Sequence, residues 1–269
     1  MDGRVKPGHD AFWKGIMGAG AMRDRELRVK WRLHVETDLA AGTPVTLDAA
    51  RAHYLRNVLR LEPGAEIALF NASDGEFRAR IERLGKAEAI LAVGERLRGP
   101  APEPDVWLLF APLKRQAVDL LAEKATELGV GRLAPVLTRH TAVTRVATER
   151  LRAIAIEAAE QCGRLSVPAV AEPEKLDTIL AGWDARRRLY VCAEQGAAEP
   201  IAHVAARAAK APFALLVGPE GGFAASELDH LRNLAFVTAL DLGPRILRAE
   251  TASLAALAIL QAWLGDWSH

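Results

Sequence analysis

The sequence predicts an α/β protein of two domains, a small strand-rich domain followed by a larger one in which strands and helices alternate. Short alternating strands with polar turns fill residues 25–98, and apolar strands separated by helical stripes fill residues 105–269. Between them, the segment Gly99-Pro100-Ala101-Pro102-Glu103-Pro104 predicts a semi-rigid linker over residues 99–104. A chain of 269 residues is long enough for two such domains.

Composition excludes several classes of protein without indicating a reaction. Half of the residues are hydrophobic and 26% are charged, which predicts a packed globular core. A net charge of +1 argues neither for nor against a nucleic-acid partner. The two cysteines, Cys162 and Cys192, and the scattered histidines show no metal-ligand spacing, so no metal is expected. No apolar run reaches the length of a membrane span, so we expect no membrane partner and a cytoplasmic protein with reduced thiols.

The first 24 residues differ from the rest of the chain. They are glycine-rich and aperiodic, and they lack the pattern of a secretory signal. We therefore predict a disordered N-terminal extension over residues 1–24, with Met22 as the natural start. In the first domain we expect strands at 32–35, 66–70, 76–81 and 88–93, which together predict a small β-barrel. A helix is expected over residues 48–59, with Ala52, Leu55, Val58 and Leu59 on its apolar face.

The second domain begins with a buried strand at 106–110 and a helix that runs from Pro112 to Gly129. Further strands are expected at 133–137, 189–193, 213–217 and 237–240, and the proline at 135 suggests that the first of these lies at a sheet edge. A helix over 148–162 has Thr148 as a candidate N-cap and Gly163 at its end. The last helix, 250–264, is apolar nearly all round, so we expect full burial by its own domain or by a second subunit. The alternation predicts a largely parallel, two-sided sheet.

Two turns rich in glycine and proline indicate a ligand pocket. Gly218-Pro219-Glu220-Gly221-Gly222 follows one buried strand, and the segment from Asp241 to Arg248 follows another and precedes the last helix. Glycine lets the backbone approach a ligand closely, and such turns build small-molecule sites at strand ends. Neither turn is a phosphate loop, because the Lys-Ser/Thr pair is absent. A local excess of arginine between Arg132 and Arg152 hints at a polyanion, with a solvated face as the equal alternative.

At these motifs the chain resembles the bacterial family that methylates N3 of a uridine in 16S ribosomal RNA, within the SPOUT superfamily of knotted methyltransferases. The resemblance covers about residues 25 to 269 and rests on LVGPEGGF at 216–223 and LGPRILRAETA at 242–252, with support from 52–61, 114–129 and 157–164. The two main motifs in that order and at that separation are very specific. The resemblance implies an N-terminal PUA-like small β-barrel and a C-terminal SPOUT α/β trefoil-knot methyltransferase domain.

The resemblance further implies that the two turns hold S-adenosyl-L-methionine. The implied cofactor-binding residues are Leu216, Val217, Gly218, Pro219, Gly221, Leu240, Leu242, Gly243, Ile246, Leu247 and Thr251. It also implies a homodimer whose pocket is completed across the interface, and no metal, because the sulfonium already activates the methyl group.

The implied substrate is 16S rRNA in the 30S subunit, near the decoding site. We expect phosphate contacts, which position RNA without reading its sequence, from basic residues in both domains. These are His53, Arg56, Arg60, Lys114, Lys124, Arg139 and Arg164. For His53 a place in the apolar core is the equal alternative.

Two residues are predicted to be catalytic. Arg248 is expected to stabilise the deprotonated base, and the alternative is an ion pair with Glu220 or Glu250. Glu220 is a candidate general base that could equally tie the two loops together, so the identity of the base stays open. The chain departs from the family at Ala224, where a serine usually caps the next helix and Ser226 is the candidate substitute, and at Cys162, where the family often has serine.

Two other functions remain open on the sequence. A related knotted methyltransferase could act on another target such as transfer RNA, and the methylated base would distinguish it. A non-catalytic RNA-binding or ribosome-assembly factor could retain the same fold. The intact cofactor loops argue against this second alternative, and a cofactor titration would decide it.

Overall fold

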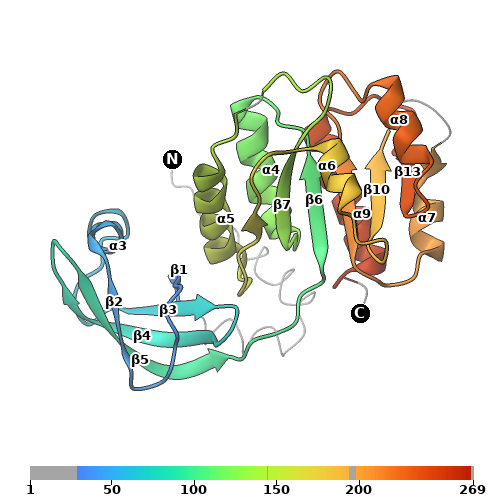
Figure 1. Cartoon of the computed structure of the whole chain (residues 1–269). Helices are drawn as coiled ribbons and strands as arrows, with labels where there is room; N and C mark the ends of the chain where they lie inside the picture. Colours follow the sequence, from blue (N-terminus) through green and yellow to red (C-terminus); the bar gives the residue numbers. More distant parts are fainter. Residues whose placement is uncertain (1–28, 144, 194–197, 268–269) are drawn as a thin grey trace, which may run out of the picture. The chain divides into compact units, whose positions relative to one another are not determined.

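The computed structural model describes residues 29–143, 145–193 and 198–267, which form two compact units (Figure 1). Within the described residues, the first unit holds 29–70 and 76–97, and the second holds 71–75 and 98–267. The predicted extension at 1–24, with Met22, lies outside the described residues. We propose 25–98 and 105–269 as the two domains and 99–104 as their linker, a segment with no helix or strand. No described helix is both long enough and apolar enough to span a bilayer.

The first unit is a curled five-stranded sheet with one short helix (Figure 1). The strand order is β1-β3-β4-β5-β2, with β1 parallel to β3 and β2 antiparallel to β5. Strands at all four predicted places are present, and β2 is an additional short strand in which only Val45 and Leu47 are buried. The elements are β1 (Arg32–His34), β2 (Pro44–Leu47), α3 (Ala49–His53), a π-helical turn η1 (Tyr54–Val58), β3 (Glu66–Asn71), β4 (Gly75–Leu84) and β5 (Ala89–Arg98).

The predicted helix at 48–59 is present but changes its pitch half-way. Asp48 caps α3 by accepting a 2.9 Å hydrogen bond from the backbone N–H of Arg51. From Tyr54 onward the helix is π-helical, and the Leu59 N–H donates to the Tyr54 carbonyl five residues earlier. The wider turn shifts the side chains around the axis, so Val58 is 59% exposed while Leu55 is fully buried. Placing Val58 on the apolar face was therefore wrong.

The second unit is a single sheet with parallel pairing throughout, as predicted. Its strand order is β11-β13-β10-β12-β6-β7-β8, and β9 also pairs with β7. The elements are β6 (Val106–Phe110), α4 (Arg115–Glu127), β7 (Arg132–Leu137), α5 (Thr148–Cys162), β8 (Ala169–Val170), β9 (Glu174–Lys175), α6 (Leu176–Ala181), β10 (Arg188–Cys192), β11 (Glu199–Pro200), α7 (Ile201–Arg207), β12 (Phe213–Val217), α8 (Ala225–Arg232), β13 (Val237–Asp241) and α9 (Ala249–Leu264).

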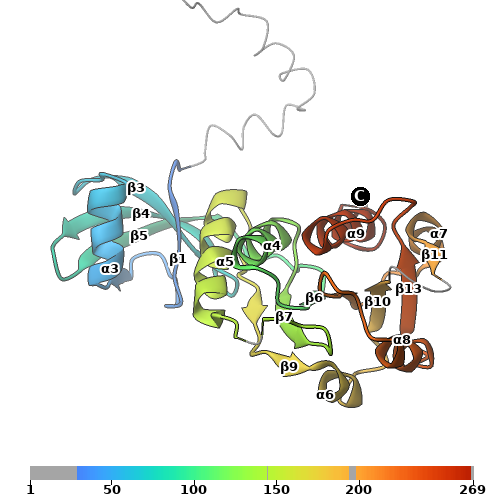
Figure 2. The same ribbon diagram turned by 90° about the horizontal axis from the view of Figure 1, so that it is seen from above.

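Helices cover both faces of this sheet. Helices α4, α5, α7 and α9 lie on one face and α6 and α8 on the other (Figure 2). The central strand β12 supplies both cores, since Leu215 and Val217 pack on the first face and Ala214 and Leu216 on the second. This alternation follows from the two-residue period of a strand, and it explains why the strand reads as a continuous apolar run.

Strand β7 is not an edge strand, contrary to the prediction from its proline. It pairs with β6 on one side and with β8 and β9 on the other. Pro135 lies after the residues that pair with β8 and before those that pair with β9. The missing N–H of the proline therefore falls where neither short strand needs a donor.

Two helix predictions also need correction. The N-cap of α5 is Ala147, and the Thr148 hydroxyl instead donates to Glu172 Oε1 at 2.8 Å. The end of α5 is as predicted, because Gly163 adopts a left-handed φ of 89°. Helix α9 buries one face only, and Trp263 on its other side is 51% exposed. Full burial of α9 within its own chain was therefore wrong.

Candidate active site

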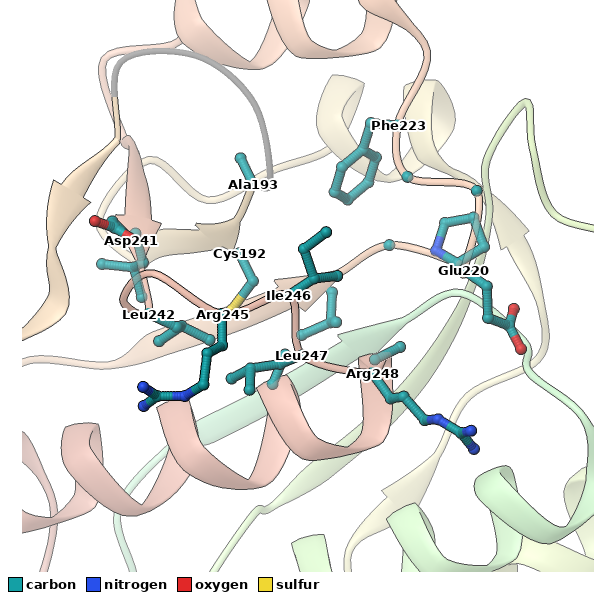
Figure 3. A pocket seen from close by; sticks show the side chains of 18 of the residues that line it. Cys192, Ala193, Glu220, Phe223, Asp241, Leu242, Arg245, Ile246, Leu247 and Arg248 are labelled. Carbon is teal, nitrogen blue, oxygen red and sulfur yellow. The ribbon is translucent and has the colours of Figure 1, made fainter.

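A cavity of about 440 Å³ opens where β10, β12 and β13 end. These three strands are parallel neighbours, and Cys192 on β10 pairs with Val217 on one side and Leu240 on the other. The carboxyl ends of the strands therefore meet at one edge of the sheet, where open α/β sheets bind ligands. The two glycine turns, 218–223 and 242–248, form facing walls of this cavity (Figure 3).

The first wall is the turn after β12. Gly218 and Pro219 are buried, and the Gly222 N–H closes the turn on the Pro219 carbonyl at 2.9 Å. Gly222 has a φ of 67°, in the left-handed region that favours glycine. A Cβ on Gly218 would lie only 3.0 Å from the Phe223 ring, so a side chain there would push against the ring. Glycine at 218 therefore fits the close packing of Phe223 against the turn.

The second wall is the turn after β13. Asp241 Oδ1 accepts a 2.8 Å hydrogen bond from the Gly243 N–H, and Gly243 has a φ of 98°. In the same turn, Leu242 and Leu247 pack against the core of the sheet, whereas the side chain of Ile246 is 89% exposed. In Figure 3 Ile246 lies between Phe223 and Leu247, so it presents an apolar side chain within the cavity.

Cys192 supplies the floor between the two turns. It is the last residue of β10 and lines the cavity with Ala193. Burial raises the pKa of the Cys192 thiol to about 12, so the sulfur stays neutral and behaves as a small apolar group. The sequence analysis missed Cys192 as a site residue, because only the strand order places β10 between the strands that carry the two turns.

The cavity brings together nine of the eleven residues predicted to bind the cofactor. Leu216 is fully buried in the core on the other side of β12, and Thr251 is exposed on α9 while Ala252 lines the cavity instead. The nine are Val217, Gly218, Pro219, Gly221, Leu240, Leu242, Gly243, Ile246 and Leu247. Lining residues that were not predicted are Cys192, Ala193, Gly222, Phe223, Leu228, Asp241, Pro244, Arg245, Ala249 and Ala252.

Both predicted catalytic residues line the cavity. Arg248 is exposed at the N-cap position of α9, and Glu220 is exposed in the first turn. Their side chains lie at the same end of the cavity, while Arg245 points to the opposite side (Figure 3). Within the described residues Arg248 forms no ion pair with Glu220 or Glu250. The structural role that was the alternative for Arg248 therefore has no support there.

Glu227 joins the first turn to the loop after β7. Its Oε2 accepts a hydrogen bond from the Ala224 N–H and its Oε1 accepts one from the Arg139 N–H, both at 2.8 Å. Helix α8 begins at Ala225, so Ser226 is not the cap and that prediction was wrong. An alanine N-cap has no acceptor of its own, and the Glu227 carboxylate provides the stabilisation instead. His140 Nδ1 also lies 3.2 Å from the carbonyl oxygens of Gly221 and Gly222.

Comparison with known proteins relates this chain to methyltransferases. A family profile described as an RNA methyltransferase domain matches residues 101–261, and one described as an RNA methyltransferase PUA domain matches residues 47–93. The ribosomal RNA small subunit methyltransferase E of Rickettsia conorii is 33% identical over 230 residues, which cover 84% of this chain and 93% of that protein. The chain belongs to the ribosomal RNA small subunit methyltransferase E family.

Two solved structures extend this relation to the whole fold. A methyltransferase of Legionella pneumophila with bound cofactor SAM is 28% identical, with a TM-score of 0.78 over 89% of this chain and 99% of that chain. The methyltransferase E of Neisseria gonorrhoeae bound to S-adenosyl methionine is also 28% identical, with a TM-score of 0.79 over 88% and 99%. The predicted family, and the predicted fold class of a SPOUT domain with a PUA-like domain, are confirmed.

The residues predicted to contact RNA have different surroundings. In the first unit His53 and Arg60 are exposed, whereas Arg56 is half-buried and donates to the Gly85 carbonyl at 2.9 Å. Because His53 is exposed, it is not a buried core residue, which was the alternative to its predicted contact with RNA. In the second unit Lys114 and Arg139 are exposed beside the carboxyl edge of the sheet, where the loops after β6 and β7 begin.

Two other members of the predicted RNA set form ion pairs within the second unit, and their RNA contacts stay a prediction. The Arg164 side chain is 9% exposed and donates to the carbonyl oxygens of Thr126 and Val130, and it pairs with Glu103. The Lys124 ammonium lies 2.7 and 2.8 Å from the carboxylates of Glu123 and Glu127, whose negative charges compensate its positive charge. The described residues contain no cluster of three or more His, Cys, Asp or Glu side chains that could hold a metal.

Proposed function

We propose that the protein is an S-adenosyl-L-methionine-dependent methyltransferase that methylates N3 of a specific uridine in 16S rRNA, near the decoding site of the small ribosomal subunit. The observation that carries the proposal is the cavity formed by two glycine turns at the ends of three parallel strands, in a chain of the methyltransferase E family. Two relatives of the same fold, each 28% identical over nearly the whole chain, were solved with this cofactor.

The cavity has the features that this cofactor needs. Val217, Leu240, Leu242 and Leu247 provide apolar walls for an adenine ring, and the turns present backbone N–H and C=O groups at its edge. Gly218 has no side chain between the backbone and the tightly packed Phe223 ring, so the backbone stays within reach of a ligand. S-adenosylmethionine supplies a methyl group that its sulfonium makes electrophilic.

Arg248 and Glu220 are placed to act on the acceptor base. The reaction replaces the N3 proton of the uridine with a methyl group. The proton must therefore leave, and negative charge builds on the carbonyl oxygens of the base. We assign Arg248, an exposed cation of the cavity lining with no ion pair among the described residues, to stabilise that charge. Glu220, at the same end of the cavity, is the candidate acceptor of the proton. Because N3 lies on the pairing edge, the uridine must be unpaired when it reacts.

The RNA is proposed to contact His53, Arg56 and Arg60 of the first unit and Lys114 and Arg139 of the second. Arg139 is the best placed of these, because Glu227 ties its backbone to the start of the helix that follows the first turn. We also propose a homodimer, since the exposed Ile246 and Trp263 leave apolar surface on the second turn and on α9. A substrate within the 30S subunit implies that the protein acts in the cytoplasm.

The decisive experiment is methyl transfer to undermethylated 30S subunits. The protein is incubated with these subunits and labelled cofactor, and the modified nucleoside is mapped by mass spectrometry. N3-methyluridine at a single 16S position supports the proposal. Methylation of transfer RNA instead would identify a related enzyme with another target. Failure to bind the cofactor in a calorimetric titration would identify a non-catalytic RNA-binding protein.

A further inference from the structure

A second cavity, distinct from the cofactor cavity, lies between the start of α4 and the segment that leads into α5. It has a volume of about 430 Å³, in the range of small-molecule sites. Apolar side chains make its walls, namely Leu113 just before α4, Val118 in the first turn of α4, Val143 and Val146 on the loop, and Leu151 in the first turn of α5. We call it the α4–α5 cavity.

Positively charged side chains surround this apolar interior. Arg115, Arg145 and Arg150 all line the cavity and are exposed. The only carboxylate among the lining residues is Asp119, which Arg150 holds in a two-pronged ion pair with contacts of 2.9 and 2.7 Å. Within the described residues neither Arg115 nor Arg145 forms an ion pair, so both guanidinium groups are available to an anion.

The α4–α5 cavity opens at the same edge of the sheet as the cofactor cavity. Strand β6 is the neighbour of β12, with Phe110 paired to Val217, and the Ala111 N–H donates to the Val217 carbonyl at 3.0 Å. The chain enters the α4–α5 cavity at Pro112, two residues after Phe110, and the cofactor cavity at Val217. Adjacent strands are about 4.8 Å apart, so the chain leaves β6 for the α4–α5 cavity next to the strand end that borders the cofactor cavity.

These observations favour one kind of occupant. An apolar slot accepts the flat face of a nucleobase, and guanidinium groups at its rim pair with the flanking phosphates. We propose that the α4–α5 cavity binds a nucleotide of the RNA substrate close to the methylated uridine, with its base between Leu113, Val118 and Val146 and its phosphate against Arg115 and Arg145. The inference rests on the proposed function, because it takes RNA as the substrate. It adds a specificity subsite that lies outside the cofactor turns.

Two variants test the cavity from different directions. Val143→Trp fills the slot from the half-buried loop, and Arg145→Glu reverses a rim charge without touching the core. Arg186→Ala is a surface control, because it removes one exposed arginine charge just before β10, at the opposite edge of the sheet. Thermal melting of all three variants confirms that each is folded before kinetics are compared.

Methyl transfer to 30S subunits and cofactor titration give the deciding measurements. The two cavity variants should raise the KM for the subunits about tenfold, the scale of losing one stacked base, while the cofactor Kd and the kcat stay near wild type. Arg186→Ala should change none of them. An unchanged KM in both cavity variants overturns the inference, and so does a parallel loss of cofactor binding, which would show a general structural effect.

Filter binding separates the failure of the subsite from the failure of the proposed function. If the wild-type protein binds 30S subunits but transfers no methyl group, the proposed function is wrong. The same variants then still decide whether the cavity holds RNA, since only an RNA-binding cavity loses subunit affinity on Val143→Trp and Arg145→Glu. If the wild-type protein is active and the two cavity variants keep its KM for the subunits, the proposed function is retained and the subsite is refuted.

Discussion

The ring of Phe223 lies directly over Gly218. Three ring carbons of Phe223 would lie 3.0 to 3.2 Å from a Cβ placed on Gly218, closer than ordinary carbon contacts. Both residues line the cavity between the two glycine turns. Any side chain at position 218 must therefore displace the ring and change the shape of the cavity.

We predict that Gly218→Ala weakens S-adenosylmethionine binding about tenfold, because overpacking costs roughly 1–3 kcal/mol at a tight contact. Isothermal titration calorimetry measures the change. Gly182→Ala is the control, since a Cβ there meets only the Thr178 carbonyl oxygen at 4.0 Å in the same unit. Wild-type affinity in Gly218→Ala would mean that the cofactor does not depend on the closure of Phe223 over the turn.

The two cysteines should differ in reactivity. Cys162 is exposed, whereas burial raises the pKa of Cys192 to about 12. At about pH 8 a thiol of that pKa is roughly one part in ten thousand thiolate, and only the thiolate is alkylated. Raising the pH toward 12 should therefore increase the labelling of Cys192, since its pKa lies above the ordinary value.

Iodoacetamide labelling with peptide mass spectrometry checks this prediction. Cys162 is the internal control in the folded protein, and a denaturant should make both cysteines react alike. Comparable labelling of both residues in the folded protein at about pH 8 would contradict the burial of the Cys192 sulfur in the cavity floor.

The sequence predicted both walls of the candidate cofactor cavity because these walls are local features. Each glycine turn directly follows an apolar strand, and the carboxyl ends of parallel strands share one edge. Residues whose place depends on more than the turn were harder to predict. Leu216 and Val217 are adjacent in sequence, yet they lie on opposite faces of β12. Cys192 was missed because no local pattern shows that β10 lies between β12 and β13.

Long-range partners are the contacts that the sequence could not show. The phosphate contact of Arg164 stays a prediction, and its guanidinium pairs with Glu103, 61 residues earlier. The π-helical turn after His53 moved Val58 to the surface, and no residue pattern at 54–58 predicted the change of pitch. In the fold, the proline in β7 marked a gap between two short partner strands and not an edge.

Glu227 should be important for stability although it is acidic and buried. Its two oxygens accept backbone N–H groups from Arg139 and Ala224, and the residue is 7% exposed. In Glu227→Gln the amide NH₂ faces one of these donors, which loses its acceptor. We expect the free energy of unfolding to fall by about 1–3 kcal/mol.

Chemical denaturation followed by circular dichroism measures this change. Asp229→Asn on the same helix is the control, because its side chain is 71% exposed and its ion pair with Arg232 should contribute less than about 1 kcal/mol. Equal stability of Glu227→Gln and wild type would show that the loop at 138–141 and the start of α8 are not held by this carboxylate.

Arg248 should affect the chemical step more than cofactor binding. It is exposed at the mouth of the cavity, forms no ion pair among the described residues and lies beside Glu220 in Figure 3. Arg248→Ala should lower kcat about 100-fold, the scale of losing one donor to a developing charge, with the cofactor Kd nearly unchanged. Single-turnover methyl transfer and calorimetry give the two values, and Arg186→Ala matches the loss of charge away from the cavity. A retained kcat would exclude Arg248 from the stabilisation of the uridine anion. A Kd that weakens in step with kcat would instead assign Arg248 to holding the cofactor.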